Sequence, residues 1–264
     1  MAFRFYIPPT EAALAPGPVL MPAATARHVK VLRLTVGEAV TVFDGTGGEW
    51  CGELLDSRTL QLHRHQAVER EAQARVMLAV GMPANERMDA LVEKAVELGV
   101  ARIQPLLTRR SVLRLQGERA ERRVAHWQGV AIAACEQCGR NRVPEVAPVA
   151  SLPDWLGQLG GDSAVSHRCL LSAPRVGTPT RPPWGSRKLG AALPFLESPV
   201  ATAPLQPLAR GESAWMVSGP EGGLDDDETA LLQRAGFRAV SLGPRVLRAD
   251  TAPLAALMRA LGGC

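Results

Sequence analysis

The chain contains Ser218-Gly219-Pro220-Glu221-Gly222-Gly223 and, farther on, Leu242-Gly243-Pro244-Arg245-Val246-Leu247-Arg248, and these two stretches decide the fold. Each follows an apolar run, at 214–217 and 237–242, and each precedes a predicted helix. Strand, glycine turn and helix in this order are typical of a ligand-binding loop, because glycine lets backbone groups approach a ligand without a side chain between them. Loops of this kind meet at the carboxyl ends of neighbouring strands in an open α/β sheet. The two stretches therefore predict a binding crevice between two strand ends.

The helix after the first loop begins with acidic residues. Asp225 and Glu228 have the spacing of a capping box, and the acidic first turn complements the helix dipole. Negative side chains at this position disfavour a phosphate. They favour a neutral or cationic ligand, such as a nucleoside that carries a sulfonium group.

Strands and helices alternate upstream of these loops. The sequence predicts strands at 75–80 and 100–107, a helix at 86–98, and a long helix within 117–138, followed by short buried strands at 169–171 and 214–217. This alternation predicts an α/β fold with a parallel sheet.

The first 70 residues have a different pattern, with short strands around the glycine-rich turn 44–48, which predicts a hairpin. A helix is predicted over 23–34, with Arg27, Lys30 and Arg33 on one face. That face is either an RNA contact or a solvated surface, and the spacing alone does not separate the two. The polar stretch 69–73 predicts a linker, which gives domains at 1–70 and 74–264.

The segment 173–210 is rich in proline and lacks periodicity. We predict a long surface loop or an insertion there.

The composition excludes several classes of protein. The chain has 264 residues, 46% hydrophobic and 21% charged, which is typical of a folded globular protein. No run approaches the ~18 apolar residues of a membrane span, and the five cysteines lack a disulfide-like spacing. We therefore expect a soluble cytoplasmic protein that does not bind membranes. The formal charge of +4 hints at a polyanionic partner, although a solvated basic surface explains it equally well.

Two cysteines and two histidines are candidate metal ligands. Cys135 and Cys138 form a C-x-x-C pair, and His63 and His65 alternate along a predicted strand. A zinc site of this type needs a second matched pair, which the sequence lacks. We predict packing thiols and no metal.

Several motifs together resemble a known family. The two glycine loops, with 93–100, Arg109-Arg110-Ser111 and 134–140, resemble the SPOUT methyltransferases, and specifically the ribosomal small subunit methyltransferase E family. In the first domain, 27–34 and 42–45 resemble the family's PUA-like RNA-binding barrel. The resemblance covers nearly the whole chain except 173–210.

The resemblance implies a fold, a reaction and partners. The expected fold is a PUA-like β-barrel followed by a SPOUT α/β domain with a C-terminal trefoil knot, forming a homodimer. The expected reaction is transfer of a methyl group from S-adenosylmethionine to N3 of a uridine in small-subunit (16S) ribosomal RNA, free or in the 30S subunit. The residues expected to hold the cofactor are Leu171, Ser172, Gly219, Pro220, Glu221, Gly222, Gly223, Leu242, Gly243, Val246 and Leu247.

Uracil N3 carries a proton and is a poor nucleophile until that proton leaves, so a base or an anion-stabilising cation is expected. The candidates for catalysis are Arg140 and Arg248, which would stabilise the uridine anion or position phosphate, and Glu136, which would position the base or accept a proton. The residues expected to contact RNA are Arg27, Lys30, Arg33, Arg109 and Arg110.

Two alternatives stay open at this point. One is a SPOUT enzyme that acts on another target, such as transfer RNA or a ribose 2′-hydroxyl. The other is an RNA-binding protein without catalytic activity, which the intact glycine loops disfavour. The chain also departs from the family at Asp250, where Glu is usual, near Met82-Pro83, where Lys is frequent, and at Pro253.

Overall fold

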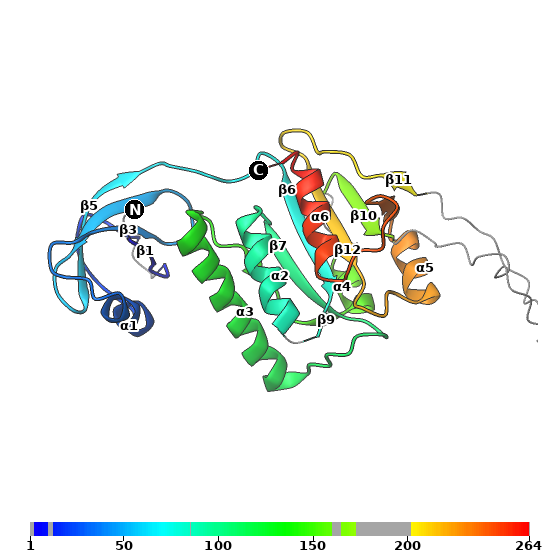
Figure 1. The fold of residues 1–264 in the computed structure, drawn as a ribbon, viewed down its shortest axis with the longest axis horizontal. Coiled ribbons are helices and arrows are strands. Elements are labelled where there is room, and N and C mark those ends of the chain that lie inside the picture. Colours follow the sequence, from blue (N-terminus) through cyan, green and yellow to red (C-terminus); the bar gives the residue numbers. More distant parts are fainter. Residues whose placement is uncertain (1–2, 10–12, 85, 160–164, 173–201, 264) are drawn as a thin grey trace, which may run out of the picture.

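The computed structural model describes residues 3–9, 13–84, 86–159, 165–172 and 202–263. The chain forms two units, each built on one sheet (Figure 1). We call residues 3–66 the N-terminal unit and residues 75–263 the C-terminal unit. The segment that joins them runs along one side of the molecule from β5 to β6 (Figure 1).

The N-terminal unit is a five-stranded sheet with one helix. Its strands are ordered β1-β3-β4-β5-β2, with β1 parallel to β3 and the other pairs antiparallel. The glycine-rich turn 44–48 joins β3 to β4, as the sequence predicts. The elements are β1 (Phe3–Tyr6), β2 (Gly17–Leu20), α1 (Ala23–Val31), β3 (Ala39–Phe43), β4 (Glu49–Leu54) and β5 (Thr59–Gln66).

Helix α1 ends earlier than the sequence predicts. The prediction of a helix to residue 34 is wrong, because the chain leaves the helix after Val31 and Arg33 adopts a left-handed backbone with φ 57°. The Leu34 N–H donates to the Val29 carbonyl and the Arg33 N–H to the Lys30 carbonyl, which is the Schellman arrangement. Glycine usually occupies this position, so no stop signal is visible in the sequence here. Arg33 does not continue the helical face of Arg27 and Lys30.

The C-terminal unit is a parallel sheet covered by helices on both faces. The strand order is β11-β13-β10-β12-β6-β7-β8, with β9 beside β7, and the predicted α/β class is confirmed. The strands are β6 (Arg75–Gly81), β7 (Arg102–Leu107), β8 (Glu145–Val146), β9 (Ala150–Ser151), β10 (His167–Leu171), β11 (Ala203–Pro204), β12 (Ser213–Ser218) and β13 (Arg238–Ser241). The helices are α2 (Glu86–Glu97), α3 (Gly117–Cys138), α4 (Leu152–Leu159), α5 (Asp226–Arg234) and α6 (Thr251–Ala260).

Strand β6 shows why these strands are apolar throughout. Val76, Leu78 and Val80 face the core formed with α2, α3 and α6, whereas Met77 and Ala79 face the core formed with α4 and α5. A strand buried on both faces has a continuous hydrophobic sequence. This explains why an apolar run without alternation is a central strand here.

The prediction of a loop over 173–210 needs a correction at its C-terminal end. Residues 173–201 lie outside the described residues. Residues 203 and 204 form β11 at the edge of the sheet, Leu205 is buried, and the Leu208 N–H donates to the Ala260 carbonyl. The prolines that suggested a loop are compatible with an edge strand, where the missing N–H is not needed.

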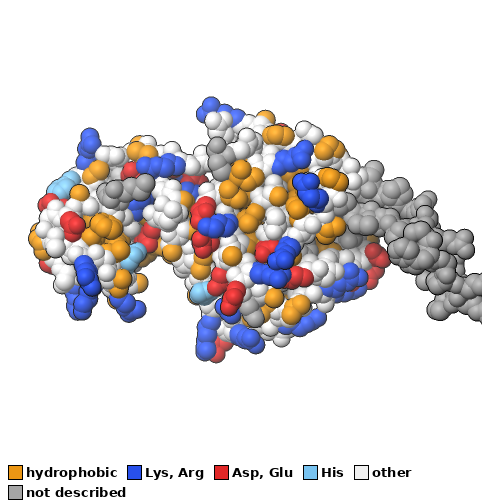
Figure 2. Space-filling view, in the orientation of Figure 1, with side chains coloured by type: hydrophobic (Ala, Val, Ile, Leu, Met, Phe, Trp, Pro, Cys, Tyr) orange, Lys and Arg blue, Asp and Glu red, His pale blue; other side chains and the backbone are white. Residues whose placement is uncertain are grey.

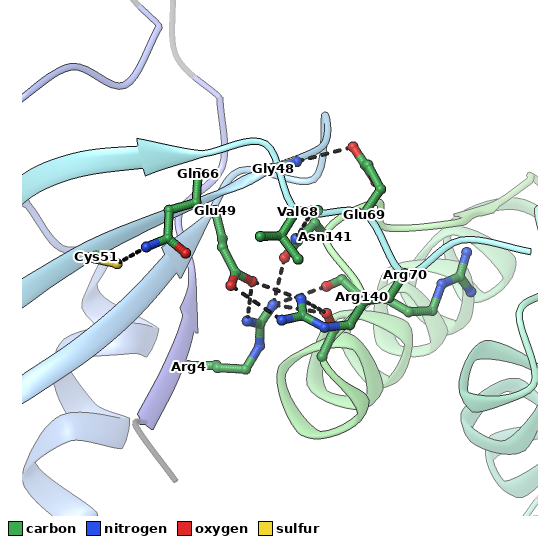
Figure 3. Close-up of polar contacts among 11 residues, drawn as sticks. Arg4, Gly48, Glu49, Cys51, Gln66, Val68, Glu69, Arg70, Arg140 and Asn141 are labelled. Atoms are coloured by element: carbon green, nitrogen blue, oxygen red, sulfur yellow. Dashed lines mark hydrogen bonds and ion pairs between the residues drawn. The ribbon is translucent and has the colours of Figure 1, made fainter.

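A polar cluster joins the two units (Figure 3). The Glu49 carboxylate accepts hydrogen bonds from Arg4 at 2.7 Å and from Arg70 at 2.9 Å. Arg4 also donates to the side chain of Asn141, at 2.7 Å, and Arg70 to the Gly139 carbonyl, so β1, β4, the joining segment and the end of α3 meet at one carboxylate. The guanidinium of Arg4 also lies over the Phe43 ring, with its carbon 5.0 Å from the ring centroid.

Replacing Glu49→Gln should change how stability depends on pH. Hydrogen bonds from Arg70 and Arg4 lower the pKa of Glu49 from 4.5 to about 2. Because the pKa is lower in the folded state, the ionised carboxylate stabilises the fold above about pH 5, and this contribution, roughly 2–3 kcal/mol, is lost as pH falls toward 2. We expect the variant to be less stable at pH 7 and to lose less stability on acidification.

Urea unfolding at pH 7 and pH 3.5 measures this change. The control is Glu145→Gln, because Glu145 forms an exposed pair with Arg102, whose contribution is expected to be below about 1 kcal/mol. Parallel pH profiles for Glu49→Gln and the unmodified protein would contradict the assignment.

No helix in the described ranges is long and apolar enough to cross a membrane.

Candidate functional site

A cavity of about 880 Å³ lies at the carboxyl ends of β10, β12 and β13. These three parallel strands end beside one another, so the loops that follow them enclose one space. The volume falls within the range of small-molecule and cofactor sites. The lining residues are Arg87, Leu170, Leu171, Ser172, Thr202, Ser218, Gly219, Pro220, Glu221, Gly223, Leu224, Asp226, Thr229, Ala239, Ser241, Leu242, Gly243, Arg245, Val246, Leu247, Arg248, Ala249 and Ala252.

The cavity brings together nearly all the residues that the sequence predicts for the cofactor. Ten of them line it: Leu171, Ser172, Gly219, Pro220, Glu221, Gly223, Leu242, Gly243, Val246 and Leu247. Gly222 does not, because it faces the other way, against Arg110: a Cβ on Gly222 would lie 3.0 Å from the Arg110 Cβ. The carbonyl of Gly222 also accepts a hydrogen bond from Arg110 at 3.0 Å.

The first glycine loop is tightly folded. A Cβ on Gly219 would lie 2.8 Å from the Leu224 nitrogen and 2.9 Å from the Gly223 carbonyl carbon, both of which are backbone atoms. At the end of the neighbouring strand β6, a Cβ on Gly81 would lie 2.7 Å from the Pro220 nitrogen. Glycine is therefore required at 219 and 81, because the backbone of the loop passes too close to either residue to leave room for a Cβ. This close packing holds the loop beside the cavity.

Arg109 and Arg110 hold the same loop and the following helix from outside the cavity. The Arg109 guanidinium pairs with Asp225 at 2.9 Å and Asp227 at 2.7 Å, and its backbone N–H donates to Glu228. Both arginines were predicted to contact RNA. The structure places them against the protein's own loop, and their RNA contacts stay a prediction.

The start of α5 has the predicted capping box. Asp225 accepts from the Glu228 N–H at 2.8 Å, and Glu228 accepts from the Asp225 N–H at 3.0 Å. Asp226 and Glu221 line the cavity, so the acidic first turn contributes negative charge to it. Arg87 also lines the cavity and pairs with Glu221 at 3.2 Å, so the cavity presents charges of both signs to a ligand.

Ser218, the last residue of β12, was not among the predicted site residues. The residue is 3% exposed and lines the cavity, and within the part of the chain that the structure describes its hydroxyl oxygen has no hydrogen-bond partner. A buried hydroxyl without a partner costs about 1–3 kcal/mol, so a ligand that bonds it gains that amount. The sequence could have indicated Ser218, because it directly follows the apolar run 214–217 and so lies at the carboxyl end of a strand, where ligands bind in an open α/β sheet.

Arg245 and Arg248, in the loop between β13 and α6, bring positive charge to the cavity. Both side chains are exposed and line the cavity. The predicted catalytic residue Arg248 is thus beside the predicted cofactor residues, whereas Arg245 was not predicted. Asp250, where the family usually has Glu, stands at the start of α6 with a helical backbone and makes no side-chain cap bond, and its carboxylate accepts from the Thr251 hydroxyl at 3.4 Å.

Arg140 lies elsewhere, at the end of α3. Its side chain is buried and paired with Glu71 through two nitrogens, and it donates to the carbonyls of Val96 and Val100 at 2.9 and 3.0 Å. It is absent from the cavity lining. All of these partners belong to the protein's own framework, which favours a structural role over the predicted contact with substrate.

Glu136, the third predicted catalytic residue, lies between the two units. Its carboxylate accepts from the Tyr6 N–H at 2.9 Å and lies 3.9 Å from the His28 ring nitrogen. Burial raises the pKa of this carboxyl. Glu136 is not among the cavity residues, and its catalytic role stays a prediction.

The predicted basic residues of the first unit are on α1 and just beyond it. Arg27, Lys30 and Arg33 are exposed, and within the described residues none of them forms an ion pair with an acidic side chain. Figure 2 shows Lys and Arg side chains gathered at the lower end of this unit, beside a hollow between the two units. Unpaired exposed cations are the feature that phosphate binding requires.

Among the described residues no group of three or more His, Cys, Asp or Glu side chains is arranged to hold a metal ion. Cys135 is buried, and burial raises the pKa of its thiol to about 12. A thiol in this state does not supply the thiolate that a zinc site needs.

Comparison with known proteins identifies the family. A model described as "RNA methyltransferase domain" matches residues 70–181 and 186–261, and one described as "RNA methyltransferase PUA domain" matches residues 22–62. The ribosomal RNA small subunit methyltransferase E of Synechocystis is 31% identical over 97% of this chain and 76% of its own length. The chain belongs to the ribosomal RNA small subunit methyltransferase E family. The predicted resemblance is thereby confirmed, as is the combination of a PUA-like unit with a parallel-sheet unit.

Other family members cover the chain equally well. The Bacillus subtilis member is 28% identical over 96% of this chain and 94% of its own length. A solved structure of the Neisseria gonorrhoeae enzyme bound to S-adenosyl methionine is 30% identical, with a TM-score of 0.75 over 97% of this chain and 95% of that one. A Legionella pneumophila methyltransferase with bound cofactor SAM is 29% identical, with a TM-score of 0.77 over 97% and 96%.

Proposed function

We propose that this chain transfers a methyl group from S-adenosylmethionine to N3 of a uridine in small-subunit ribosomal RNA. The observation that carries the proposal is the cavity at the ends of β10, β12 and β13, which gathers the residues of both glycine loops in a chain of this family. Relatives named as ribosomal RNA small subunit methyltransferases support the RNA substrate, and two solved relatives bind S-adenosylmethionine.

The cavity fits S-adenosylmethionine in shape and chemistry. Leu170, Leu171 and Leu247 supply apolar surface for the adenine ring, and the glycine loops bring backbone groups within reach of its edge. The unpartnered Ser218 hydroxyl supplies a buried polar contact, and Arg245 is suited to the cofactor's carboxylate. When bound, the cofactor supplies an electrophilic methyl group on its sulfonium sulfur, and Asp226 brings negative charge to the space that holds it.

The protein's part in the reaction is to hold the uridine and to favour its anion. Arg248 lines the cavity and is exposed, so its guanidinium would stabilise negative charge on the uracil ring as the N3 proton passes to solvent water. The walls orient the base for in-line attack, which converts binding energy into rate. Arg140 and Glu136 would act on the same base only if it reached the end of α3. The contacts described above favour structural roles, because Arg140 holds the joining segment through Glu71 and Glu136 contacts the N-terminal unit through Tyr6.

We further propose the domain division 1–70 and 74–264, which the polar stretch 69–73 predicts, together with a trefoil knot in the second domain and a homodimer, both of which the family resemblance implies. The first domain would bind RNA through Arg27, Lys30 and Arg33, and Arg109 and Arg110 would bind it beside the cavity. A substrate in the small ribosomal subunit would place the protein in the cytoplasm.

Replacing Arg33→Gly should stabilise the protein and weaken its binding to RNA. The left-handed backbone at Arg33 costs a non-glycine residue about 1 kcal/mol, so glycine should raise the free energy of unfolding by roughly 0.5–1 kcal/mol. Loss of an exposed cation should weaken RNA binding and reduce its salt dependence.

Urea unfolding and filter binding to small-subunit ribosomal RNA measure the two effects. Because the two effects have opposite signs, weaker binding cannot be attributed to unfolding. Unchanged RNA affinity in a stabilised Arg33→Gly variant would remove Arg33 from the RNA contacts.

The test of the proposed function is the modification profile of small-subunit ribosomal RNA from a strain that lacks this gene. Mass spectrometry of its nucleosides should show the loss of one 3-methyluridine, and the gene supplied on a plasmid should restore it. An unchanged profile, or loss of a transfer RNA or ribose modification instead, would refute the proposal. Calorimetry with S-adenosylmethionine separates a non-catalytic RNA-binding protein, which would show no cofactor binding.

A further inference from the structure

A second, smaller hollow lies next to the cofactor cavity. It measures about 300 Å³ and is lined by Ala84, Val112, Leu113, Arg114 and Arg119. Glu221 joins the two spaces, because its carboxylate lines the larger cavity and accepts hydrogen bonds at 3.2 Å from the Ala84 N–H and from Arg87. A ligand that fills the smaller hollow therefore lies beside one that fills the larger.

The apolar part of this hollow is exposed although the chain around it is firmly held. Val112 is 73% exposed, whereas its neighbours Ser111 and Leu113 are 4% and 8% exposed. The Ser111 hydroxyl lies 2.9 Å from the Thr108 hydroxyl, and the Ser111 N–H donates to the Thr108 carbonyl at 3.1 Å. Val112 is thus presented to solvent by an anchored turn, and an exposed valine on a rigid wall suits the flat face of a base.

The charge of this hollow is positive. Arg119, in the first turn of α3, has no ion-pair or hydrogen-bond partner within the described residues, and Arg114 uses one nitrogen to donate to the Arg109 carbonyl at 3.0 Å. The nearby acid Glu118 is already paired with Arg122 at 2.6 Å. Two guanidinium groups beside an apolar wall match the two parts of a nucleotide, its phosphate and its base.

We propose that this hollow binds a nucleotide of single-stranded RNA that flanks the methylated uridine. The proposal rests on the proposed function, because it places the second nucleotide of the same substrate. Val112 and Ala84 contact the face of the flanking base, and Arg114 and Arg119 bind its phosphate. An apolar wall distinguishes this site from one for a free phosphate, which needs only cations.

The experiment compares Arg119→Gln with the unmodified protein in filter binding to small-subunit ribosomal RNA over a series of salt concentrations. Losing one phosphate contact should raise the Kd about three- to tenfold and lower the slope of log K against log salt by about 0.7–0.9. The Kd for S-adenosylmethionine, measured by calorimetry, should stay unchanged.

Two further variants separate the site from a general loss of charge. Arg234→Gln removes an equal charge from the exposed last turn of α5, outside both hollows, and should leave the salt slope unchanged. Val112→Ser should weaken RNA binding about threefold or more without changing the salt slope, because it removes contact with a base and no charge.

The outcomes distinguish failure of the flanking-nucleotide site from failure of the proposed methyltransferase function. If the unmodified protein methylates RNA and Arg119→Gln and Val112→Ser bind it as tightly as the unmodified protein does, the flanking site is refuted and the methyltransferase proposal stands. If the unmodified protein neither binds nor methylates the RNA, both are refuted. An equal effect of Arg234→Gln would also refute the site, because general charge would then explain the result.

Discussion

Gly219→Ala is expected to abolish measurable binding of S-adenosylmethionine, raising the Kd by about 100-fold or more. The added Cβ would lie within 3 Å of two backbone atoms of the same loop, the Leu224 nitrogen and the Gly223 carbonyl carbon. Backbone atoms cannot swing aside as the end of a flexible side chain can. The loop must therefore move, and a displacement of about 1 Å is enough to disrupt a binding or catalytic geometry.

The matched control is Gly129→Ala. Gly129 is an exposed glycine within α3, and a Cβ there would have no atom within 4 Å. Because alanine favours the helix, this variant should be more stable by about 0.5–1 kcal/mol and should bind the cofactor normally. Isothermal titration calorimetry measures both variants. Normal cofactor affinity in Gly219→Ala would show that the cavity beside this loop is not the cofactor site.

Arg140→Ala is expected to lower the free energy of unfolding by about 3–5 kcal/mol. The substitution leaves Glu71 without its partner and removes the guanidinium donor to the carbonyls of Val96 and Val100, of which the Val96 carbonyl keeps the Gly99 N–H. Removing one partner of a buried ion pair costs this amount because the remaining charge is not compensated. Small proteins are stable by only about 5–15 kcal/mol, so the variant should unfold at a clearly lower urea concentration.

Two comparisons test whether Arg140 acts structurally. Arg142→Ala removes a neighbouring, exposed partner of Glu69 and should cost less than about 1 kcal/mol. Glu71→Ala breaks the same buried pair as Arg140→Ala but keeps the guanidinium. We expect both variants of the pair to be destabilised and, where both are folded, to have the same kcat. A loss of kcat confined to Arg140→Ala would support the direct catalytic role predicted from the sequence.

The sequence predicted the parts of the fold that depend on local pattern. Strands β6, β7, β10, β12 and β13, helix α3 and the capping box of α5 follow from apolar runs, helical spacing and the Asp225 to Glu228 interval, and the structure has these elements. The end of α1 was missed because its left-handed residue is Arg33 and not glycine. Edge strand β11 was missed because its pairing with β13 depends on residues far apart in the chain.

The residues predicted for the cofactor and those predicted for catalysis do not all lie in the same place. Ten of the eleven residues predicted for the cofactor line one cavity, because glycine loops after strands meet at one edge of a parallel sheet wherever they occur in the chain. Arg140 and Glu136 were grouped with them by motif resemblance, and spacing gives no information on whether a side chain faces a cavity or the protein's own framework. Their partners, Glu71 and Tyr6, lie 65 or more residues away, so the burial of both side chains could only be seen in the folded structure.

Methyl transfer to uridine N3 is tested by identifying the nucleoside that the purified protein labels. The purified protein is incubated with methyl-labelled S-adenosylmethionine and small ribosomal subunits from a strain that lacks this gene, and the labelled nucleoside is identified by mass spectrometry. We expect the unmodified protein to place the label in a single 3-methyluridine of the small-subunit RNA, and the Gly219→Ala variant to place no label in it. Label in any other nucleoside, or equal labelling by Gly219→Ala, would contradict it.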